Sequence, residues 1–173
     1  MPSSAYISLG SNQGDRAGYL LLAVRGMLDA RLNVFRLSRI YQTEPVDVSD
    51  QAEFLNMVAE LRGELPPPEQ LLTLLLQIEH MLGRTRELLR GPRNIDLDLL
   101  CYDDQVIQTE FLTLPHPRLH LRRFVLVPLA ELAPDLRVPT LNATVNKLLT
   151  NSDDHSQVQL WYPTALPLHT KNL

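Results

Sequence analysis

The sequence predicts an α+β protein with a mainly antiparallel sheet. Helix-like and strand-like segments intermix along the chain with short links. The strand-like segments alternate apolar and polar residues instead of running fully apolar, which favours an antiparallel sheet with at least one half-exposed face. The chain has 173 residues, 45% of them hydrophobic, enough to bury a sizeable core without disulfides or metals. We expect a single domain in residues 1–150 and a polar, irregular C-terminal tail in residues 151–173.

The first expected elements are a strand, a helix and a second strand. Residues 5–9 are typical of a short strand, and the turn sequence GSNQGD follows, with Asp15 placed to cap the next helix. In that helix the spacing predicts four core-facing residues, which are Leu20, Val24, Met27 and Leu28. The second strand should run from about residue 33 to residue 41.

The middle of the chain supplies a loop, a third strand and a second helix. Residues 43–50, TEPVDVSD, are rich in turn formers, and residues 54–61, FLNMVAEL, alternate as a strand does. Three prolines at residues 66–68 precede the strongly helical EQLLTLLLQIEHML, and proline is tolerated in the first turn of a helix. The helical pattern stops after Gly83.

The remaining elements follow an arginine-rich loop. A strand with two aspartates, RNIDLDLL, comes first, and then a short strand near residues 111–114 and a Pro-His-Pro turn. A helix should begin at Arg122 or Arg123, and residues 144–149 add about one helical turn. In the polar tail, Trp161 could dock on the body of the protein.

Composition argues against several classes of protein. Cys101 is the only cysteine, so no intramolecular disulfide and no cysteine-based zinc site can form, and we expect a cytoplasmic setting. The longest apolar runs are too short to span a bilayer, and the N-terminus lacks the basic and apolar segments of an export signal. The net charge of -4 argues against a general nucleic-acid binder. We therefore expect a soluble protein with no membrane and no nucleic-acid partner.

Two aspartates in one strand are the strongest chemical signal. Because side chains alternate along a strand, Asp96 and Asp98 share one face, opposite Leu97 and Leu99. Carboxylates about 7 Å apart can hold hard divalent cations between them. Four arginines within residues 84–93 supply the planar donors that phosphate oxygens prefer. From this short pattern alone, a solvated pair of aspartates that binds nothing remains the alternative.

The usual cradles for a nucleotide are missing from the sequence. There is no GxxxxGK[ST] loop and no GxGxxG fingerprint. The backbone of GSNQG, residues 10–14, could hold phosphate, but the same residues are typical of a plain turn. If phosphates bind, side chains must therefore do most of the holding.

Five segments together resemble one known family. They are YISLGSNQGDR, YQTEPV, FLNMVAEL, GRTRELLRGPRNIDLDLL and LTLPHPRLHLRRFVLVPLAELAP, in this order from about residue 5 to residue 139. The chain is similar in them to the 6-hydroxymethyl-7,8-dihydropterin pyrophosphokinases of folate biosynthesis. The resemblance implies a ferredoxin-like three-layer α/β/α sandwich, with residues 1–150 as the catalytic domain.

The resemblance also implies a reaction and a set of site residues. The reaction is ATP-dependent transfer of diphosphate to the 6-hydroxymethyl group of the dihydropterin, releasing AMP. The resemblance implies ATP as the co-substrate and two Mg2+ ions bound by Asp96 and Asp98. The implied catalytic residues are Arg84, Arg86, Arg93, Asp96 and Asp98. The implied ATP-binding residues are Arg84, Arg93, Leu99, Leu112, Thr113, His116 and Arg122.

The pterin pocket is implied by the same resemblance. Its residues are Thr43, Pro45, Val46, Phe54, Asn56 and Phe124. The Asn56 carboxamide donates and accepts hydrogen bonds at once, as a pterin edge requires, and Phe54 and Phe124 match the aromatic positions that sandwich the ring. A phenylalanine in an apolar run is also typical of a core, and a buried asparagine often bonds local backbone, so these structural alternatives stay open.

Several points stay open at the level of sequence. The arginine-rich loop carries Leu88 and Leu89 where some members have a tryptophan, which weakens any expectation of stacking on the nucleotide from this loop. Two other functions are a noncatalytic nucleotide-binding module of the same fold and a metal-dependent kinase with another acceptor alcohol. No general base is forced, although Asp98 is a candidate. The oligomeric state is open, with a monomer favoured.

Overall fold

The computed structural model describes residues 1–44, 52–83 and 94–164. Within them, an antiparallel six-stranded sheet runs in the order β10-β3-β4-β1-β5, with β2 also paired to β4. The strands are β1 Ser3–Ser11, β2 Val34–Leu37, β3 Tyr41–Thr43, β4 Phe54–Gly63, β5 Asp96–Tyr102 and β10 Val158–Leu160. The longest strands, β1 and β4, lie side by side in the middle of the sheet. The prediction of an α+β protein with a mainly antiparallel sheet is confirmed.

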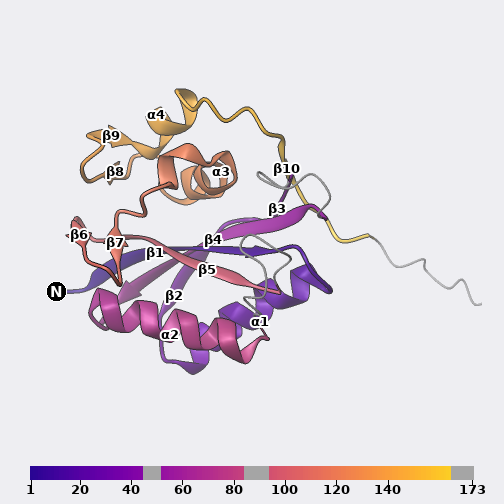
Figure 1. Cartoon of the computed structure of the whole chain (residues 1–173), viewed down its shortest axis with the longest axis horizontal. Helices are drawn as coiled ribbons and strands as arrows, with labels where there is room; N and C mark the ends of the chain where they lie inside the picture. Colours follow the sequence, from indigo (N-terminus) through magenta and orange to yellow (C-terminus); the bar gives the residue numbers. More distant parts are fainter. Residues whose placement is uncertain (45–51, 84–93, 165–173) are drawn as a thin grey trace, which may run out of the picture.

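Helices cover both faces of the sheet (Figure 1). On one face lie α1 Arg16–Asp29 and α2 Pro68–Met81, and on the other lie α3 Arg123–Leu132 and α4 Val145–Thr150. The smaller elements are the 3-10 turn η1 Leu119–Leu121 and two hairpins, β6 Ile107–Gln108 with β7 Thr113–Leu114 and β8 Arg137–Val138 with β9 Ala143–Thr144. The expectation of a half-exposed sheet face is wrong for the central strands, because seven consecutive residues of β1 and of β4 are buried.

Local sequence signals explain where the helices begin. The Asp15 carboxylate accepts a hydrogen bond from the Gly18 N–H at 3.0 Å and so caps α1, as predicted. Pro68 opens α2, where its missing N–H has no cost. One core assignment in α1 is wrong: Leu28 is 50% exposed, because the buried stripe of this helix is made of Leu20, Ala23 and Met27.

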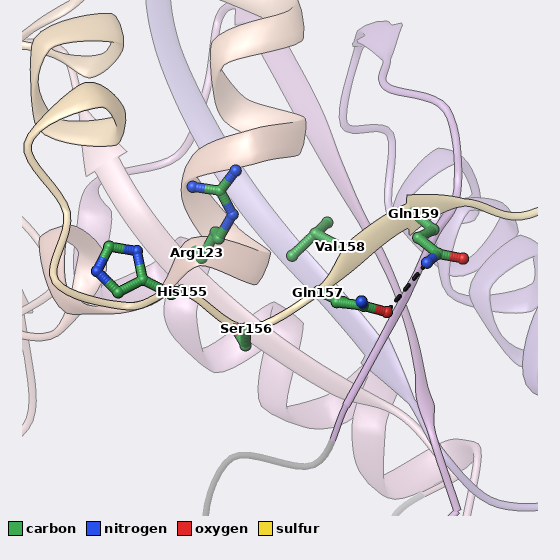
Figure 2. Close-up of a pocket in the computed structure, with 6 residues that line it drawn as sticks. All are labelled: Arg123, His155, Ser156, Gln157, Val158 and Gln159. Atoms are coloured by element: carbon green, nitrogen blue, oxygen red, sulfur yellow. Dashed lines mark hydrogen bonds between the residues drawn. The ribbon is translucent and has the colours of Figure 1, made fainter.

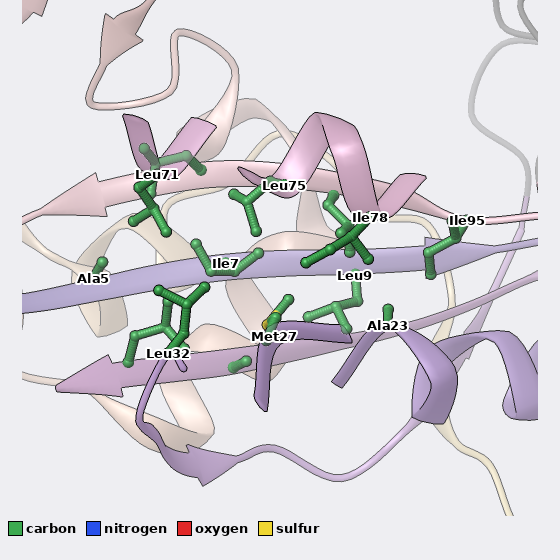
Figure 3. Packing of buried hydrophobic residues seen from close by; sticks show 14 of the residues in the cluster. Ala5, Ile7, Leu9, Ala23, Met27, Leu32, Leu71, Leu75, Ile78 and Ile95 are labelled. Atoms are coloured by element: carbon green, nitrogen blue, oxygen red, sulfur yellow. The ribbon is translucent and has the colours of Figure 1, made fainter. Parts of the chain in front are cut away.

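Two hydrophobic cores lie on opposite faces of the sheet. Figure 3 shows the larger one, in which Ile7 and Leu9 of β1 meet Met27 of α1 and Leu75 and Ile78 of α2. The smaller core lies under α3; its buried members are Tyr6, Val58, Leu100, Cys101, Leu119, Val125, Leu126, Leu129, Leu132, Val138 and Val145. Because helices pack on both faces of the sheet, side chains that alternate in direction along a strand lie in one core or the other.

The predicted second strand, residues 33–41, is wrong as a single element. It divides into β2 and β3, and residues 38–40 between them lie in no strand. At the break, the Ser38 N–H donates to the Val58 carbonyl at 2.9 Å, and the Ser38 hydroxyl accepts from the Val58 N–H at 2.9 Å. A side-chain oxygen thus takes the place of one backbone acceptor, which interrupts the regular ladder.

The expectation of an irregular C-terminal tail is wrong for residues 158–160. These residues form β10, in which Val158 lies opposite Thr43 and Leu160 opposite Tyr41. Trp161 is partly buried against the larger core, as the sequence allowed, and its backbone N–H donates to the Ile40 carbonyl at 2.9 Å. A three-residue edge strand in a polar segment has too little periodicity to be seen in sequence.

Candidate functional site

The two aspartates of β5 lie on the α3 side of the sheet. Asp96 and Asp98 are partly exposed, whereas Leu97 and Leu99 between and after them are buried in the larger core, so the predicted alternation is confirmed. Their neighbours on β1 are small: Asp96 lies opposite Gly10, and Asp98 opposite Ser8. The aspartates therefore face space that no bulky cross-strand neighbour fills.

The edge position of β5 is stabilised by a buried carboxylate. Since β5 pairs only with β1 among the described strands, the N–H groups on its other side need different acceptors. Glu79 of α2 provides one, because its Oε1 accepts from the Leu97 N–H at 2.7 Å. Leu97 lies between the two aspartates, so this bond fixes the strand at the point where they project.

One row of residues crosses the sheet from β3 to β5. In register, Tyr41 lies opposite Asn56, Asn56 opposite Gly10, and Gly10 opposite Asp96. Adjacent strands are about 4.8 Å apart, so Asn56 and Asp96 flank Gly10 at roughly 10 Å from each other. A Cβ on Gly10 would lie 2.9 Å from the Asn56 Oδ1, closer than real side chains approach. Glycine is therefore what lets the Asn56 carboxamide occupy its position.

The residues around Asn56 form a compact polar and aromatic group. The Asn56 Nδ2 donates to the Thr43 hydroxyl at 2.6 Å, and both residues are buried. Phe54 follows the same strand face, and its Cδ1 would lie 3.8 Å from a Cβ on Gly10. Three of the residues predicted for the pterin pocket, Thr43, Phe54 and Asn56, are thus brought together by the pairing of β3 with β4.

The start of α3 brings a cation to the aspartates. The Arg122 Nη1 lies 3.8 Å from the Asp98 Oδ2, with 23% and 32% of the two side chains exposed. This distance is beyond a hydrogen bond, so the contact is an ion pair screened in part by solvent. The Arg122 guanidinium carbon also lies 5.6 Å from the centre of the Phe124 ring, within the range of a cation–π contact.

His116 is held as a neutral ring beside this group. Its backbone N–H donates to the Leu100 carbonyl at 2.8 Å, and its Nδ1 accepts from the Arg118 N–H at 3.1 Å, which assigns the ring proton to Nε2. Burial, followed by the charges of Arg122 and Arg118, lowers the pKa of His116 to about 4, against a smaller opposing effect of Asp96. At neutral pH His116 is therefore an uncharged hydrogen-bond donor through Nε2.

The other predicted residues lie elsewhere or outside the described ranges. Leu99 and Leu112 are buried in the larger core, and Thr113 is exposed on β7, so their part in adenine binding stays a prediction. The remaining predicted residues, Arg84, Arg86, Arg93, Pro45 and Val46, lie outside the described residues.

Sequence reasoning missed three residues that shape this site. Ser8 and Gly10 of β1 lie opposite the aspartates, and Glu79 of α2 accepts the Leu97 N–H. The alternation of the predicted strand, residues 5–9, already placed Ser8 on the face opposite Ile7 and Leu9, which was a usable signal. The prediction of Gly10 in the following turn is wrong, because β1 continues to Ser11. Glu79 carried no such signal, because only the packing of α2 against β5 brings it there.

The carboxylates of Asp96 and Asp98 suit a cation that also binds an anionic ligand. In residues 1–44, 52–83 and 94–164, no group of three or more His, Cys, Asp and Glu side chains is placed to enclose a metal. Two carboxylates on one strand match Mg2+, which keeps several waters and takes its other ligands from substrate phosphates. None of the helices in the described part of the chain has the length and apolar character needed to cross a membrane.

Comparisons with known proteins agree on one family. Residues 6–134 match the family model described as HPPK, 7,8-dihydro-6-hydroxymethylpterin-pyrophosphokinase. A 2-amino-4-hydroxy-6-hydroxymethyldihydropteridine pyrophosphokinase of Bacillus subtilis (strain 168) is 47% identical over 148 residues, which cover 85% of this chain and 88% of that protein. One from Haemophilus influenzae is 37% identical over 158 residues, covering 91% and 98%.

A solved structure supports the same fold. The wild-type HPPK-DHPS of Plasmodium falciparum with pteroate superposes with a TM-score of 0.68 at 15% sequence identity. The match covers 87% of this chain and 42% of that longer one. At this identity the likeness concerns the fold alone.

Proposed function

The chain belongs to the 7,8-dihydro-6-hydroxymethylpterin-pyrophosphokinase family, and from that premise we propose which of its residues carry the reaction. The activity is that of a 2-amino-4-hydroxy-6-hydroxymethyldihydropteridine pyrophosphokinase in folate biosynthesis. It transfers diphosphate from ATP to the 6-hydroxymethyl group of the dihydropterin and releases AMP.

The observation that carries the proposal is the row Asn56, Gly10 and Asp96 across three adjacent strands. It sets a carboxamide suited to a pterin edge roughly 10 Å from a carboxylate suited to a cation. A pterin held at Asn56 would therefore direct its hydroxymethyl group toward the end of the row where a polyphosphate would lie. In-line transfer needs this alignment more than it needs covalent help from the protein.

Asp96 and Asp98 would hold two Mg2+ ions. When bound, these ions neutralise the charge that the triphosphate carries and develops during transfer. The fit rests on two hard carboxylate donors on one strand face, opposite the small residues Ser8 and Gly10. Metals of this size and charge prefer such oxygen donors to nitrogen or sulfur.

The phosphates would be held by arginines and by His116. Arg122 lies beside Asp98 and can donate to a phosphate oxygen through its guanidinium. His116, neutral at pH 7, can donate from Nε2 without adding charge. Arg84, Arg86 and Arg93 would complete this group from the segment outside the described residues.

The dihydropterin would bind among Thr43, Gly10, Phe54, Asn56 and Phe124. Asn56 has one amide hydrogen committed to Thr43, which leaves its oxygen and its other amide hydrogen for a ligand edge. Phe54 and Phe124 would contact the two faces of the ring, as aromatic pairs do with flat ligands. The backbone of Pro45 and Val46 would close this pocket, and Leu99, Leu112 and Thr113 would line the adenine.

We also propose a more detailed fold and a cellular setting for the protein. The sheet order β3-β4-β1-β5, with α1 and α2 on one face, supports a ferredoxin-like arrangement in which α3 and α4 form the third layer. We assign catalysis to residues 1–150 and regard the protein as a cytoplasmic monomer.

Product identification tests the proposal. Wild-type protein is incubated with ATP, Mg2+ and 6-hydroxymethyl-7,8-dihydropterin, beside the variants Asp96→Asn and Asp98→Asn. Asp104→Asn is the control, because Asp104 is an exposed aspartate of the turn after β5. We expect AMP from the wild type and the control, and a loss of at least about 100-fold in both site variants.

Other outcomes would contradict it in distinct ways. ADP as the product would indicate an ordinary kinase, and no turnover would indicate a noncatalytic module. Full activity in both Asp96→Asn and Asp98→Asn would remove the cation site from the proposal.

A further inference from the structure

The first turn of α3 is capped by a side chain from the C-terminal segment. Its N-cap residue is Arg122, whose side chain makes no cap hydrogen bond. The N–H groups of a first helical turn need acceptors from outside the helix. Asp154 supplies one, because its Oδ2 accepts from the Arg123 backbone N–H at 2.8 Å. A carboxylate here also interacts favourably with the positive end of the helix dipole.

Asp154 is itself held in place on both sides. Its Oδ1 accepts from the Ser156 N–H at 3.0 Å, and its own N–H donates to the Ser152 hydroxyl at 3.2 Å. Burial acts to raise the pKa of Asp154, but the hydrogen bonds from Ser156 and from the Arg123 backbone outweigh it and leave the pKa below its usual value. Asp154 is therefore a charged acceptor throughout the neutral range.

The segment that carries Asp154 continues onto the sheet. We call residues 152–161 the C-terminal strap. Arg123 at the start of α3 and the strap residues 155–159 line a shallow groove with a volume of about 360 Å³. Figure 2 shows these six residues. Within this lining Val158 pairs with Thr43, and beyond it the Trp161 backbone N–H donates to the Ile40 carbonyl. The strap thus joins the start of α3 to β3.

Both of these attachment points adjoin the candidate active site. At the α3 end, Arg122 comes directly before the capped residue and lies beside Asp98. At the β3 end, the Thr43 hydroxyl accepts from Asn56. Because a guanidinium must be held within a fraction of an ångström to match a phosphate, a small shift of this helix start matters.

We propose that Asp154 is a positioning residue for the transfer reaction, which holds Arg122 beside Asp98 by capping the first turn of α3. The inference rests on the proposed function of Arg122 and Asp98. Asp154 bonds backbone groups and acts on the reaction only through the helix start. Its removal changes the placement of Arg122 and leaves the aspartates of β5 where they are.

The test compares substitutions of neighbouring aspartates. Asp154→Ala removes the cap, Asp154→Asn keeps a side-chain oxygen that can accept from Arg123, and Asp153→Ala is the control because Asp153 is exposed. Steady-state kinetics are expressed per folded molecule, with folding checked by thermal denaturation. We expect kcat/KM to fall about tenfold in Asp154→Ala, to recover to within about threefold in Asp154→Asn, and to stay at the wild-type value in the control.

A double-mutant cycle separates positioning from a general loss of stability. If Asp154 acts through Arg122, then Asp154→Ala changes kcat/KM by less than about twofold in an Arg122→Ala background. The inference would be overturned if the double variant lost kcat/KM by the product of the two single losses. Unchanged kinetics per folded molecule in Asp154→Ala would overturn it as well. Should Asp154→Ala fail to fold, Asp154→Glu replaces it, since the charge is kept and the acceptor is displaced by one methylene. Unchanged kinetics in that variant would overturn the inference too.

The same set of assays distinguishes this inference from the proposed function. Asp98→Asn is measured in parallel. An active Asp98→Asn variant would count against the proposed cation site, whatever Asp154 does. An inactive Asp98→Asn variant together with unchanged kinetics of the Asp154 variants would overturn only the positioning role.

Discussion

At position 10 the absence of a side chain is itself a feature of the site. Gly10 lies between Asn56 and Asp96 in the row across the sheet. Its backbone conformation is open to any residue, so the need for glycine comes from the space and not from backbone strain. The added methyl of an alanine would meet the Asn56 Oδ1 at 2.9 Å, and the buried carboxamide would have to shift.

Gly10→Ala should therefore weaken binding of the dihydropterin and leave binding of ATP unchanged. We expect the KM for the dihydropterin to rise about tenfold, because one methyl group in a tight pocket has effects of this size, and the KM for ATP to change little. Gly26→Ala is a matched control: its methyl would meet Ile78 at 3.0 Å, away from the site, so any effect should be on the melting temperature and not on the KM for the dihydropterin. Equal increases in both KM values for Gly10→Ala would argue against Asn56 as a pterin ligand.

His116 should lower the stability of the folded protein at low pH. Its pKa is lowered from 6.5 to about 4 in the folded protein, mainly by burial and then by Arg122 and Arg118. The unfolded chain therefore binds more protons between pH 6.5 and pH 4, so this group costs stability progressively as the pH falls through that window. The full cost is on the order of 3 kcal/mol once the pH is below both pKa values.

His116→Gln should remove this part of the acid sensitivity. Urea denaturation at pH 7 and at pH 4.5 would show a smaller loss of unfolding free energy for the variant than for the wild type. His80→Gln serves as the control, because His80 is an exposed histidine near the end of α2. If His116→Gln and His80→Gln lost the same stability on acidification, the partly buried and neutral state of His116 would be contradicted.

At the scale of elements, β5 depends on a helix for one of its hydrogen bonds. Glu79 of α2 is 2% exposed, and it accepts from the Leu97 N–H between the two aspartates. Glu79→Ala would leave that N–H buried without this acceptor, which costs roughly 1–3 kcal/mol. Glu79→Gln keeps an oxygen acceptor and should lose less.

Chemical denaturation and hydrogen exchange can measure this effect. We expect Glu79→Ala to lower the unfolding free energy and to speed amide exchange at Leu97 more than at Leu9 on the neighbouring strand. Glu69→Ala, an exposed position in the first turn of α2, is the control. Exchange at Leu97 as slow as in the wild type would show that the edge of β5 does not need Glu79.

The elements also show which parts of this site a sequence can reveal. Asp96 and Asp98 were predictable because the period of two is a local property of a strand. The break at Ser38 and the pairing of β10 with β3 were not, since each depends on which strand lies alongside. The same holds for Gly10, whose partner Asn56 is set by register, and for the neutral state of His116, which arises mainly from burial in the folded protein and then from Arg122 and Arg118.

At the scale of the whole molecule, α3 is fastened to the sheet at both ends. Asp154 caps its start, and near its end the Arg36 guanidinium donates to the Leu132 carbonyl at 2.8 Å. Arg36 also pairs with Glu60, a fully buried carboxylate of β4 that Arg62 contacts as well. The Glu60 carboxylate is buried while the two arginine side chains are 40% and 47% exposed, and removing a partner of a buried carboxylate is costly, so these links should couple the α3 layer to the central strands.

This coupling predicts that the strap unfolds together with the rest of the protein. Trp161 is the single tryptophan, and it packs against the larger core, so its fluorescence reports on the strap, whereas far-UV circular dichroism reports on the helices. We expect the two signals to give one urea midpoint, because coincident transitions are the mark of a single cooperative unit. Trp161→Ala should lower the midpoint seen by circular dichroism, and Tyr162→Ala, at a position 71% exposed, should leave it unchanged. A fluorescence transition at clearly lower urea would mean that residues 152–161 separate before the sheet opens, and a strap attached so weakly could not hold the start of α3 in place.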